Sequence, residues 1–130
     1  MDFKLHFDHF NINVTDLDKS IAFYKEALGL AKSGEIAPES GDFKIVYLQA
    51  PGDSFRLELT WLRDHEEAYE LGENESHIAL RLAPGSDFDA MREYHRERGM
   101  ICFENKQMGI YFINDPDDYW IEILPPKNTK

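Results

Sequence analysis

Residues 118–124, DYWIEIL, are the stretch that decides the fold. Apolar side chains alternate along it with the period of two that is typical of a β-strand, with Tyr119, Ile121 and Ile123 on one face and Trp120, Glu122 and Leu124 on the other. A carboxylate therefore interrupts a mostly apolar face. A single glutamate of this kind usually faces solvent, so its position indicates a site only if other binding groups share the face.

The first half of the chain holds a matching strand. Residues 54–61, SFRLELTW, place Glu58 on a face opposite Phe55 and the two leucines. Histidines occupy the same kind of position in the first strand of each half, with His9 in HFNINV and His77 in HIALRL. Glu58 follows His9 by 49 residues and Glu122 follows His77 by 45, so the two halves correspond closely.

One helix is predicted in each half, directly after the first strand. In the first half TDLD has the spacing of a capping box, with Thr15 as the N-cap and Asp18 at the positive end of the helix dipole. Gly29 supplies the left-handed residue that commonly ends a helix. Ser86 and Asp89 have capping-box spacing in the second half. The sequence therefore predicts where each of the two helices begins.

The order of strand, helix and further strands occurs twice. After the first helix, a polar loop with Pro38 and Gly41 precedes FKIVYLQA and SFRLELTW, which the turn PGD joins as a hairpin; after the second come MICFE, GIYFIN and DYWIEIL. We predict an α+β fold in one domain, residues 1–130. It consists of two tandem βαβββ modules, approximately residues 5–61 and 76–125, joined by an acidic connector, residues 62–75. Each module is too small to bury its own sheet.

Composition excludes several classes of function. The chain has 130 residues, and 25 acidic against 14 basic residues give a net charge of −11, which repels nucleic acid and anionic lipid. The one cysteine, Cys102, has no partner for an internal disulfide and is predicted to be a small core residue. The segment MDFKLHFDHF lacks the apolar run of a signal peptide. We expect a cytoplasmic protein with a small-molecule substrate.

The matched polar residues predict a metal site. If the polar faces of the two modules come together, His9, Glu58, His77 and Glu122 converge, and two imidazoles with two carboxylates suit a divalent transition metal. Any one of these residues alone is more simply explained as a surface or core residue, but four at matched positions are harder to explain in that way. We interpret the other histidines as structural: His6, His65 and His95.

Four segments resemble the lactoylglutathione lyase (glyoxalase I) family of the vicinal oxygen chelate superfamily: DHFNINVTDLDKSIAFYKEALGL, LELTW, YELGENESHIALRL and INDPDDYWIEIL. The resemblance implies a half-open, eight-stranded, barrel-like sheet around one metal, and isomerisation of the hemithioacetal of methylglyoxal and a thiol to a lactoyl thioester. It also implies that Glu122 is the main base and that Glu58 serves the opposite face of the substrate. A homodimer is expected, because sites in the family are often built from two subunits, although single-chain arrangements exist.

The chemistry of the ligand set narrows the choice of metal. Two histidines and two carboxylates leave two positions of an octahedron for water or substrate oxygens, which favours Ni²⁺ or Co²⁺ over a closed tetrahedral Zn²⁺ site. Zn²⁺ and Mn²⁺ also accept nitrogen and oxygen ligands. The choice among these four metals stays open at this point.

The sequence departs from the family at three positions. Asp118 stands where the family usually has glycine, and we expect the turn to survive because aspartate tolerates unusual turn dihedral angles. Glutathione-dependent members hold the γ-glutamyl end of glutathione with an arginine and an asparagine, and Asn13 and Leu62 occupy those positions here. We therefore expect poor affinity for glutathione. We also expect five residues to border the substrate: Asn13, Arg56, Leu62, Arg81 and Trp120.

Other members of the superfamily provide the alternatives. Extradiol dioxygenases and fosfomycin-modifying thiol transferases use two histidines and one carboxylate, and epimerases typically carry an amide at the second ligand position, so Glu58 weighs against all three. A metal-free drug-binding resistance protein typically lacks the ligands altogether. These alternatives stay open as less favoured functions.

Overall fold

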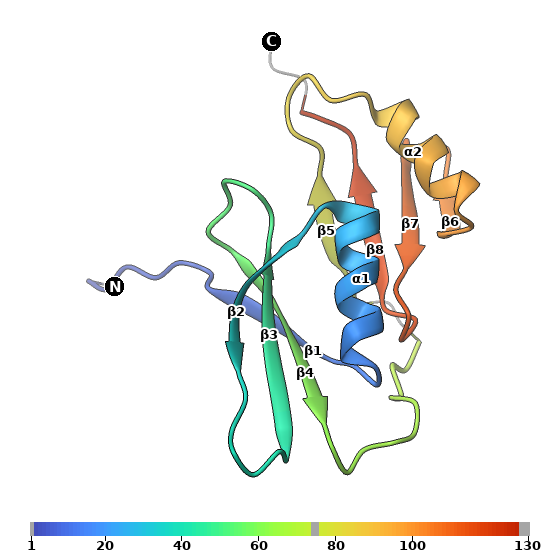
Figure 1. The fold of residues 1–130 in the computed structure, drawn as a ribbon. Coiled ribbons are helices and arrows are strands. Elements are labelled where there is room, and N and C mark those ends of the chain that lie inside the picture. Colours follow the sequence, from blue (N-terminus) through green and yellow to red (C-terminus); the bar gives the residue numbers. More distant parts are fainter. Residues whose placement is uncertain (1, 74–75, 128–130) are drawn as a thin grey trace. The chain divides into compact units, whose positions relative to one another are not determined.

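The computed structural model describes residues 2–73 and 76–127 (Figure 1). The last two residues of the predicted connector, 74 and 75, lie outside these ranges, as do residue 1 and residues 128–130. The chain divides into two compact units, Met1–Tyr69 and Glu70–Lys130. Each unit has the element order βαβββ, which confirms the predicted α+β fold of tandem modules.

The first unit is a four-stranded mixed sheet with one helix. Its elements are β1 (His9–Asn13), α1 (Leu17–Leu28), β2 (Ala31–Ile36), β3 (Phe43–Gln49) and β4 (Arg56–Leu62). The strands lie in the order β1-β4-β3-β2, with β1 parallel to β4 and the other neighbours antiparallel. A parallel pair needs a long crossover connection, which the helix and the two middle strands supply here.

The second unit repeats this topology. Its elements are β5 (Ile78–Arg81), α2 (Phe88–Glu97), β6 (Ile101–Asn105), β7 (Ile110–Asn114) and β8 (Trp120–Leu124). The order is β5-β8-β7-β6, and β5 again runs parallel to β8 (Figure 1). The first and last strands of each unit are therefore hydrogen-bonded neighbours.

Strand alternation assigns one face of each sheet to the core, as the sequence predicted. In the first unit Leu57 and Leu59 of β4 are buried, whereas Glu58 between them is only partly covered. In the second unit Ile121 and Ile123 of β8 are buried on either side of Glu122. The histidines and glutamates of interest thus lie on the face that does not form the core.

Both helices begin one residue later than the sequence predicted. The N-cap of α1 is Asp16, whose carboxylate accepts from the backbone N–H of Lys19 at 3.1 Å, and the N-cap of α2 is Asp87, which accepts from Ala90 at 3.0 Å. The capping roles predicted for Thr15 and Ser86 are wrong. Aspartate caps as well as serine or threonine, and it adds a negative charge beside the helix dipole.

The strand β2 differs from the sequence prediction, which places a polar loop in this region. Its segment, AKSGEI, lacks the alternation of a half-buried strand, and most of its residues are exposed. It pairs only with β3 at the edge of the sheet, with a register shift between Lys32 and Gly34. An edge strand of this kind is determined by its neighbour more than by its own composition.

The turn before β8 confirms the expectation for Asp118, which adopts a left-handed conformation with φ of 70°. Its carboxylate accepts a hydrogen bond from the Asn114 side chain at 3.0 Å. The buried carboxylate of Asp115 accepts from the backbone N–H groups of Asp117 and Tyr119, at 2.9 Å each. These bonds hold the entry into β8 and so fix where Glu122 lies.

The corrected cap gives a direct test. Replacing Asp87 by alanine removes the acceptor for the Ala90 N–H and should lower the free energy of unfolding by about 1 kcal/mol. The neighbouring variant Ser86→Ala is the control and should change it by less than about 0.5 kcal/mol, as expected for a surface position. Urea denaturation of both variants provides the measurement. An equal loss in Ser86→Ala would restore the capping box predicted from the sequence.

Candidate metal site

The first unit brings His9 and Glu58 together. Glu58 lies directly across from Asn11 in the parallel pairing of β1 and β4, so His9, two residues earlier on the same face, is its diagonal neighbour. His9 Nε2 is 3.4 Å from Glu58 Oε2. The side chain of Glu58 is 13% exposed and that of His9 is 38% exposed, so the pair is accessible to a small ligand.

The second unit repeats this arrangement with His77 and Glu122. Glu122 lies across from Ala79 in the pairing of β5 and β8, and His77 again precedes that partner by two residues. His77 Nε2 is 3.5 Å from Glu122 Oε1, with 33% and 17% of the two side chains exposed. Each unit therefore presents one imidazole nitrogen and one carboxylate, in the same geometry.

These pairs have the chemistry that a divalent transition metal requires, since imidazole and carboxylate ligands suit such ions. Within residues 2–73 and 76–127, the structure gathers no group of three or more His, Cys, Asp or Glu side chains that would form a complete metal centre. The donors occur as two matched pairs, one in each unit. Each pair supplies one imidazole and one carboxylate, which is half of the predicted set of two histidines and two carboxylates.

Polar residues surround the pair of the first unit. His9 Nδ1 lies 2.6 Å from Asp8 Oδ2, so Nδ1–H can donate to this carboxylate, and Nε2 is the ring nitrogen on the side of Glu58. Arg56 reaches the same Asp8 oxygen at 3.3 Å, and its guanidinium lies 4.0 Å above the Tyr47 ring. The hydrogen bonds from His9 and Arg56 hold the pKa of Asp8 below its ordinary value.

Tyr47 completes these surroundings from β3, where it lies directly across from Glu58. The edge of its ring faces His9, with ring centroids 5.8 Å apart. The Glu58 carboxylate on the neighbouring strand is the main reason that the pKa of Tyr47 is raised. Neither Tyr47 nor Asp8 was identified from the sequence, although the hairpin register of β3 and β4 would have placed Tyr47 opposite Glu58.

Aromatic residues surround the pair of the second unit. Phe112, directly across from Glu122 in β7, meets His77 edge to face with centroids 5.1 Å apart. Trp120 lies 5.5 Å from Phe112 and 6.2 Å from Phe103, measured between ring centroids. The face that carries Glu122 is therefore an apolar aromatic surface.

The residues predicted to border the substrate have varied environments. Asn13 accepts a hydrogen bond from Asn11 at 3.0 Å, and Leu62 is partly buried at the end of β4. Arg81 donates to the backbone carbonyl of Pro125 at 2.7 Å. The guanidinium groups of Arg56 and Arg81 are thus already bonded within the protein, whereas Trp120 belongs to the aromatic surface.

The other predicted structural residues lie away from the two pairs. His95 is fully buried, and its Nδ1 lies 2.7 Å from the Tyr111 hydroxyl, which confirms a structural role. His65 stacks on Tyr69 with centroids 3.9 Å apart. Cys102 is partly buried, and burial raises the pKa of its thiol, so the thiol stays protonated at neutral pH.

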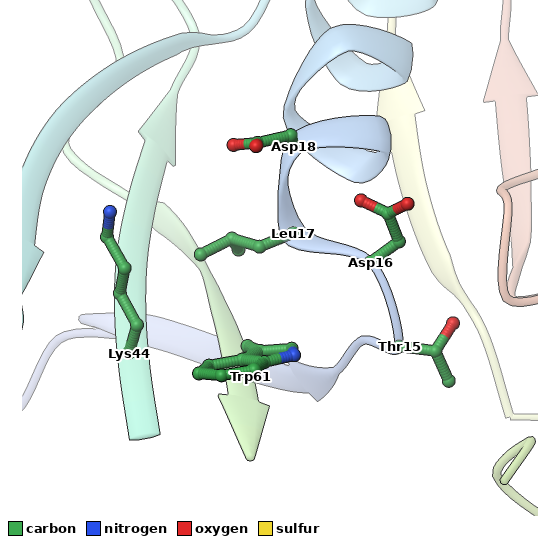
Figure 2. Close-up of a pocket in the computed structure, with 6 residues that line it drawn as sticks. All are labelled: Thr15, Asp16, Leu17, Asp18, Lys44 and Trp61. Atoms are coloured by element: carbon green, nitrogen blue, oxygen red, sulfur yellow. The ribbon is translucent and has the colours of Figure 1, made fainter. Parts of the chain in front are cut away.

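A separate hollow of about 350 Å³ lies at the start of α1 (Figure 2). Trp61 and Lys44 line it from the sheet, and residues 15–18 line it from the segment that leads into α1 and from its first turn. Trp61 is three residues from Glu58 in β4, so the two side chains point to opposite faces. The hollow is therefore distinct from the His9–Glu58 pair.

Comparison with known proteins identifies the class. Residues 6–123 match the Glyoxalase/Bleomycin resistance protein/Dioxygenase superfamily, and the chain belongs to this superfamily. A lactoylglutathione lyase of Neisseria meningitidis serogroup A is 31% identical, over 92% of this chain and 90% of that protein. A probable lactoylglutathione lyase of Synechocystis is 33% identical, over 94% and 96%. These relatives confirm the resemblance to the glyoxalase I family.

A solved structure shows the same fold. The trypanothione-dependent glyoxalase I of Leishmania major aligns with a TM-score of 0.79 at 29% identity, covering 94% of this chain and 87% of that one. Members of the superfamily use a divalent metal, in agreement with the donor types found here. Neither helix in the part of the chain that the structure describes is long and apolar enough to cross a membrane.

The contacts of Asp8 predict a pH dependence in metal-free protein. Because its pKa is lowered by folding, the stabilisation from Asp8 is fully present above the ordinary value of 3.8 and is lost as the pH falls through the lowered value. A carboxyl ¹³C NMR titration should give a midpoint below 3.8. His9→Leu should raise the midpoint more than Arg56→Leu, because the hydrogen bond from His9 is the largest cause. A wild-type midpoint at or above 3.8 would contradict the geometry.

Proposed function

We propose that this protein is a metal-dependent isomerase that converts the hemithioacetal of methylglyoxal and a thiol into a lactoyl thioester. The supporting observation is the repetition of one His–Glu pair, at the same place in the register, in both units of a chain whose relatives include lactoylglutathione lyases. We assign it to the cytoplasm and to a homodimer, as expected from the sequence.

In this proposal the four residues of the two pairs bind one divalent ion: His9, Glu58, His77 and Glu122. With Asp8 bonded to Nδ1, the Nε2 atom of His9 on the side of Glu58 would be available to the ion. When bound, the ion supplies a Lewis acid beside the substrate oxygens. We propose Ni²⁺ or Co²⁺, since two positions would be left for oxygen atoms of water or substrate.

The reaction itself is the transfer of one proton between adjacent carbons. Glu122 takes the proton from the carbon that carries the thiol sulfur, and electrons of that C–H bond form the enediolate. Glu122 then returns a proton to the neighbouring carbon. The hydroxyl proton of the first carbon passes to the oxygen of the neighbouring carbon, which leaves a hydroxyl there and a thioester carbonyl beside the sulfur. Glu58 lies toward the opposite face of the substrate. The aromatic surface that includes Trp120 offers an apolar contact for the methyl group.

The metal and the base can be tested together. Wild-type protein should bind one divalent ion per site, and alanine at any of the four ligands should reduce the bound metal, as measured by elemental analysis. Glu122→Gln should retain much of the metal, because an amide oxygen can still coordinate, while the isomerisation rate falls by about 10²–10⁴-fold. Light scattering of the same samples should give the molar mass of two chains, as expected for a homodimer.

Glu104→Gln is the matched control, since Glu104 is a strand glutamate of the same unit whose carboxylate bonds to Arg96 at 2.7 Å instead of to a ligand histidine. Its activity should stay within about twofold of wild type, as expected for an exposed pair of this type. Full activity of Glu122→Gln would assign the base to another residue.

We further propose that glutathione is not the preferred thiol. Asn13 and Leu62 replace the residues that hold the γ-glutamyl end of glutathione in glutathione-dependent members, and a charged hydrogen bond of that kind contributes about 1.5–3 kcal/mol. Arg56 and Arg81 do not make up for this loss, because both guanidinium groups are bonded to other parts of the protein. The family includes an enzyme described as trypanothione-dependent, which supports variation in the thiol.

Steady-state kinetics with a panel of hemithioacetals test this proposal. We expect the KM for the glutathione adduct to exceed that for at least one other low-molecular-weight thiol. The double variant Asn13→Arg/Leu62→Asn should lower the glutathione KM by about tenfold, which corresponds to about 1.4 kcal/mol. A wild-type KM lowest for glutathione would show that this is an ordinary glutathione-dependent enzyme.

A further inference from the structure

The segment before β1 exposes large apolar side chains. Residues 2–7, which we call the N-terminal arm, belong to neither a helix nor a strand, and Figure 1 shows them as a trace that leads away from the start of β1. Phe3, Leu5 and Phe7 are 79%, 84% and 89% exposed. Phe3 and Leu5 also lie outside residues 6–123, the part of the chain that matches the superfamily. The proposed reaction does not use the arm.

The apolar residues of the arm occupy alternate positions, which is the pattern of a half-buried strand. In an extended backbone Phe3, Leu5 and Phe7 project to one side, and Lys4 and His6 project to the other. A strand of this pattern is stable when a sheet edge supplies its backbone hydrogen bonds and an apolar surface covers one side. The arm thus has one side suited to burial and one suited to solvent.

The pairing of the first sheet ends where the arm begins. The register of β1 with β4 starts with His9 opposite Arg56, and the backbone N–H of Arg56 donates to the carbonyl of Asp8 at 3.1 Å. Because β4 begins at Arg56, the arm continues past the end of the strand beside it. Its backbone therefore needs a partner strand from another sheet.

The outer strand of the second sheet carries matching exposed residues. β6 is the edge strand in the order β5-β8-β7-β6, and an edge strand presents unpaired backbone groups to a further strand. Phe103 in β6 is 47% exposed, and Met108 in the turn that follows it is 71% exposed. In β2, the outer strand of the first sheet, the exposed large apolar residue is Ile36. The edge at β6 therefore offers more apolar surface to an added strand.

We propose that the N-terminal arm binds a second copy of this chain, where it adds to the outer edge of β6 and places its apolar side against Phe103 and Met108. Each copy carries both the arm and the edge, so a two-fold axis forms both contacts at once and closes the assembly as a dimer. The inference rests on the homodimer of the proposed function and is independent of the proposed reaction.

The area involved is that of a stable interface. A large buried side chain of this kind contributes about 150 Å², so the three apolar side chains of one arm account for about 450 Å². Two arms and the two edges that they cover then bury about 1,800 Å², within the range of about 1,200–2,000 Å² for stable protein interfaces. The arm is therefore large enough to hold two chains together.

Sedimentation and light scattering of the metal-free full chain test the proposal. Wild-type protein should have the molar mass of two chains. The variant Phe3→Ser/Leu5→Ser/Phe7→Ser should raise the dimer Kd by more than about tenfold, because it removes the apolar area that the second copy covers. Lys4→Ser/His6→Ser is the matched control, since it changes the polar side of the same arm, and it should keep the Kd within about threefold of wild type.

A second pair of variants tests the edge that receives the arm. Met108→Lys places a charge against the apolar side of the arm and should raise the dimer Kd by more than about tenfold. Ile36→Lys makes the same kind of change on β2 and should keep the Kd within about threefold. The reverse pattern would overturn the assignment to β6. Thermal unfolding of each variant checks that the fold is retained.

Hydrogen exchange of the wild-type protein gives an answer that needs no variant. The amides of the arm should exchange slowly well above the dimer Kd and rapidly in dilute protein, and rapid exchange at both concentrations would overturn the inference. A wild-type dimer whose Kd changes by less than tenfold in the triple variant would also overturn it and would leave the homodimer intact. A monomeric wild-type protein would overturn both, whereas isomerase activity in that monomer would leave the proposed reaction intact.

Discussion

The structure depends on the parallel pairing of the first and last strands in each unit. This pairing places a histidine and a glutamate that are far apart in the sequence within 3.4 Å in the first unit and 3.5 Å in the second. A shift of the register by one residue would turn either glutamate toward the core, where Leu57, Leu59, Ile121 and Ile123 now pack. Core packing and the geometry of each His–Glu pair are thus fixed by the same hydrogen-bond ladder.

Repetition of this pairing gives each half of the chain the same pair of donor groups. Each unit contributes one imidazole and one carboxylate, and neither pair alone satisfies the usual coordination of a transition metal. The surrounding residues then diverge: Asp8 adds a charged hydrogen-bond partner in the first unit, whereas Phe112 and Trp120 add apolar surface in the second. The two repeated backbones therefore carry different side chains around the same His–Glu pair.

The strongly acidic composition of the chain is consistent with the proposed binding of a cation. A net charge of −11 raises the local concentration of divalent ions and lowers that of anionic ligands. The same charge disfavours an anionic tripeptide unless arginine side chains are directed at it, and Arg56 and Arg81 are bonded within the protein. The charge balance and the two arginine environments are therefore consistent with the proposal that glutathione is not the preferred thiol.

The sequence by itself determined the features that depend on local pattern: the alternation of the strands, the face on which each of the four predicted ligands lies, and the presence of two helices. It misplaced both N-caps, because Thr15 and Asp16, or Ser86 and Asp87, are neighbouring residues with similar capping ability. It also missed β2, whose exposed segment forms a strand only because β3 offers a partner. Only the tertiary structure decided the register that makes each histidine the diagonal neighbour of its glutamate, and the contacts of Tyr47 and Asp8. These depend on strands brought together from distant parts of the chain, and a hydrogen bond between them exists only once those strands have paired.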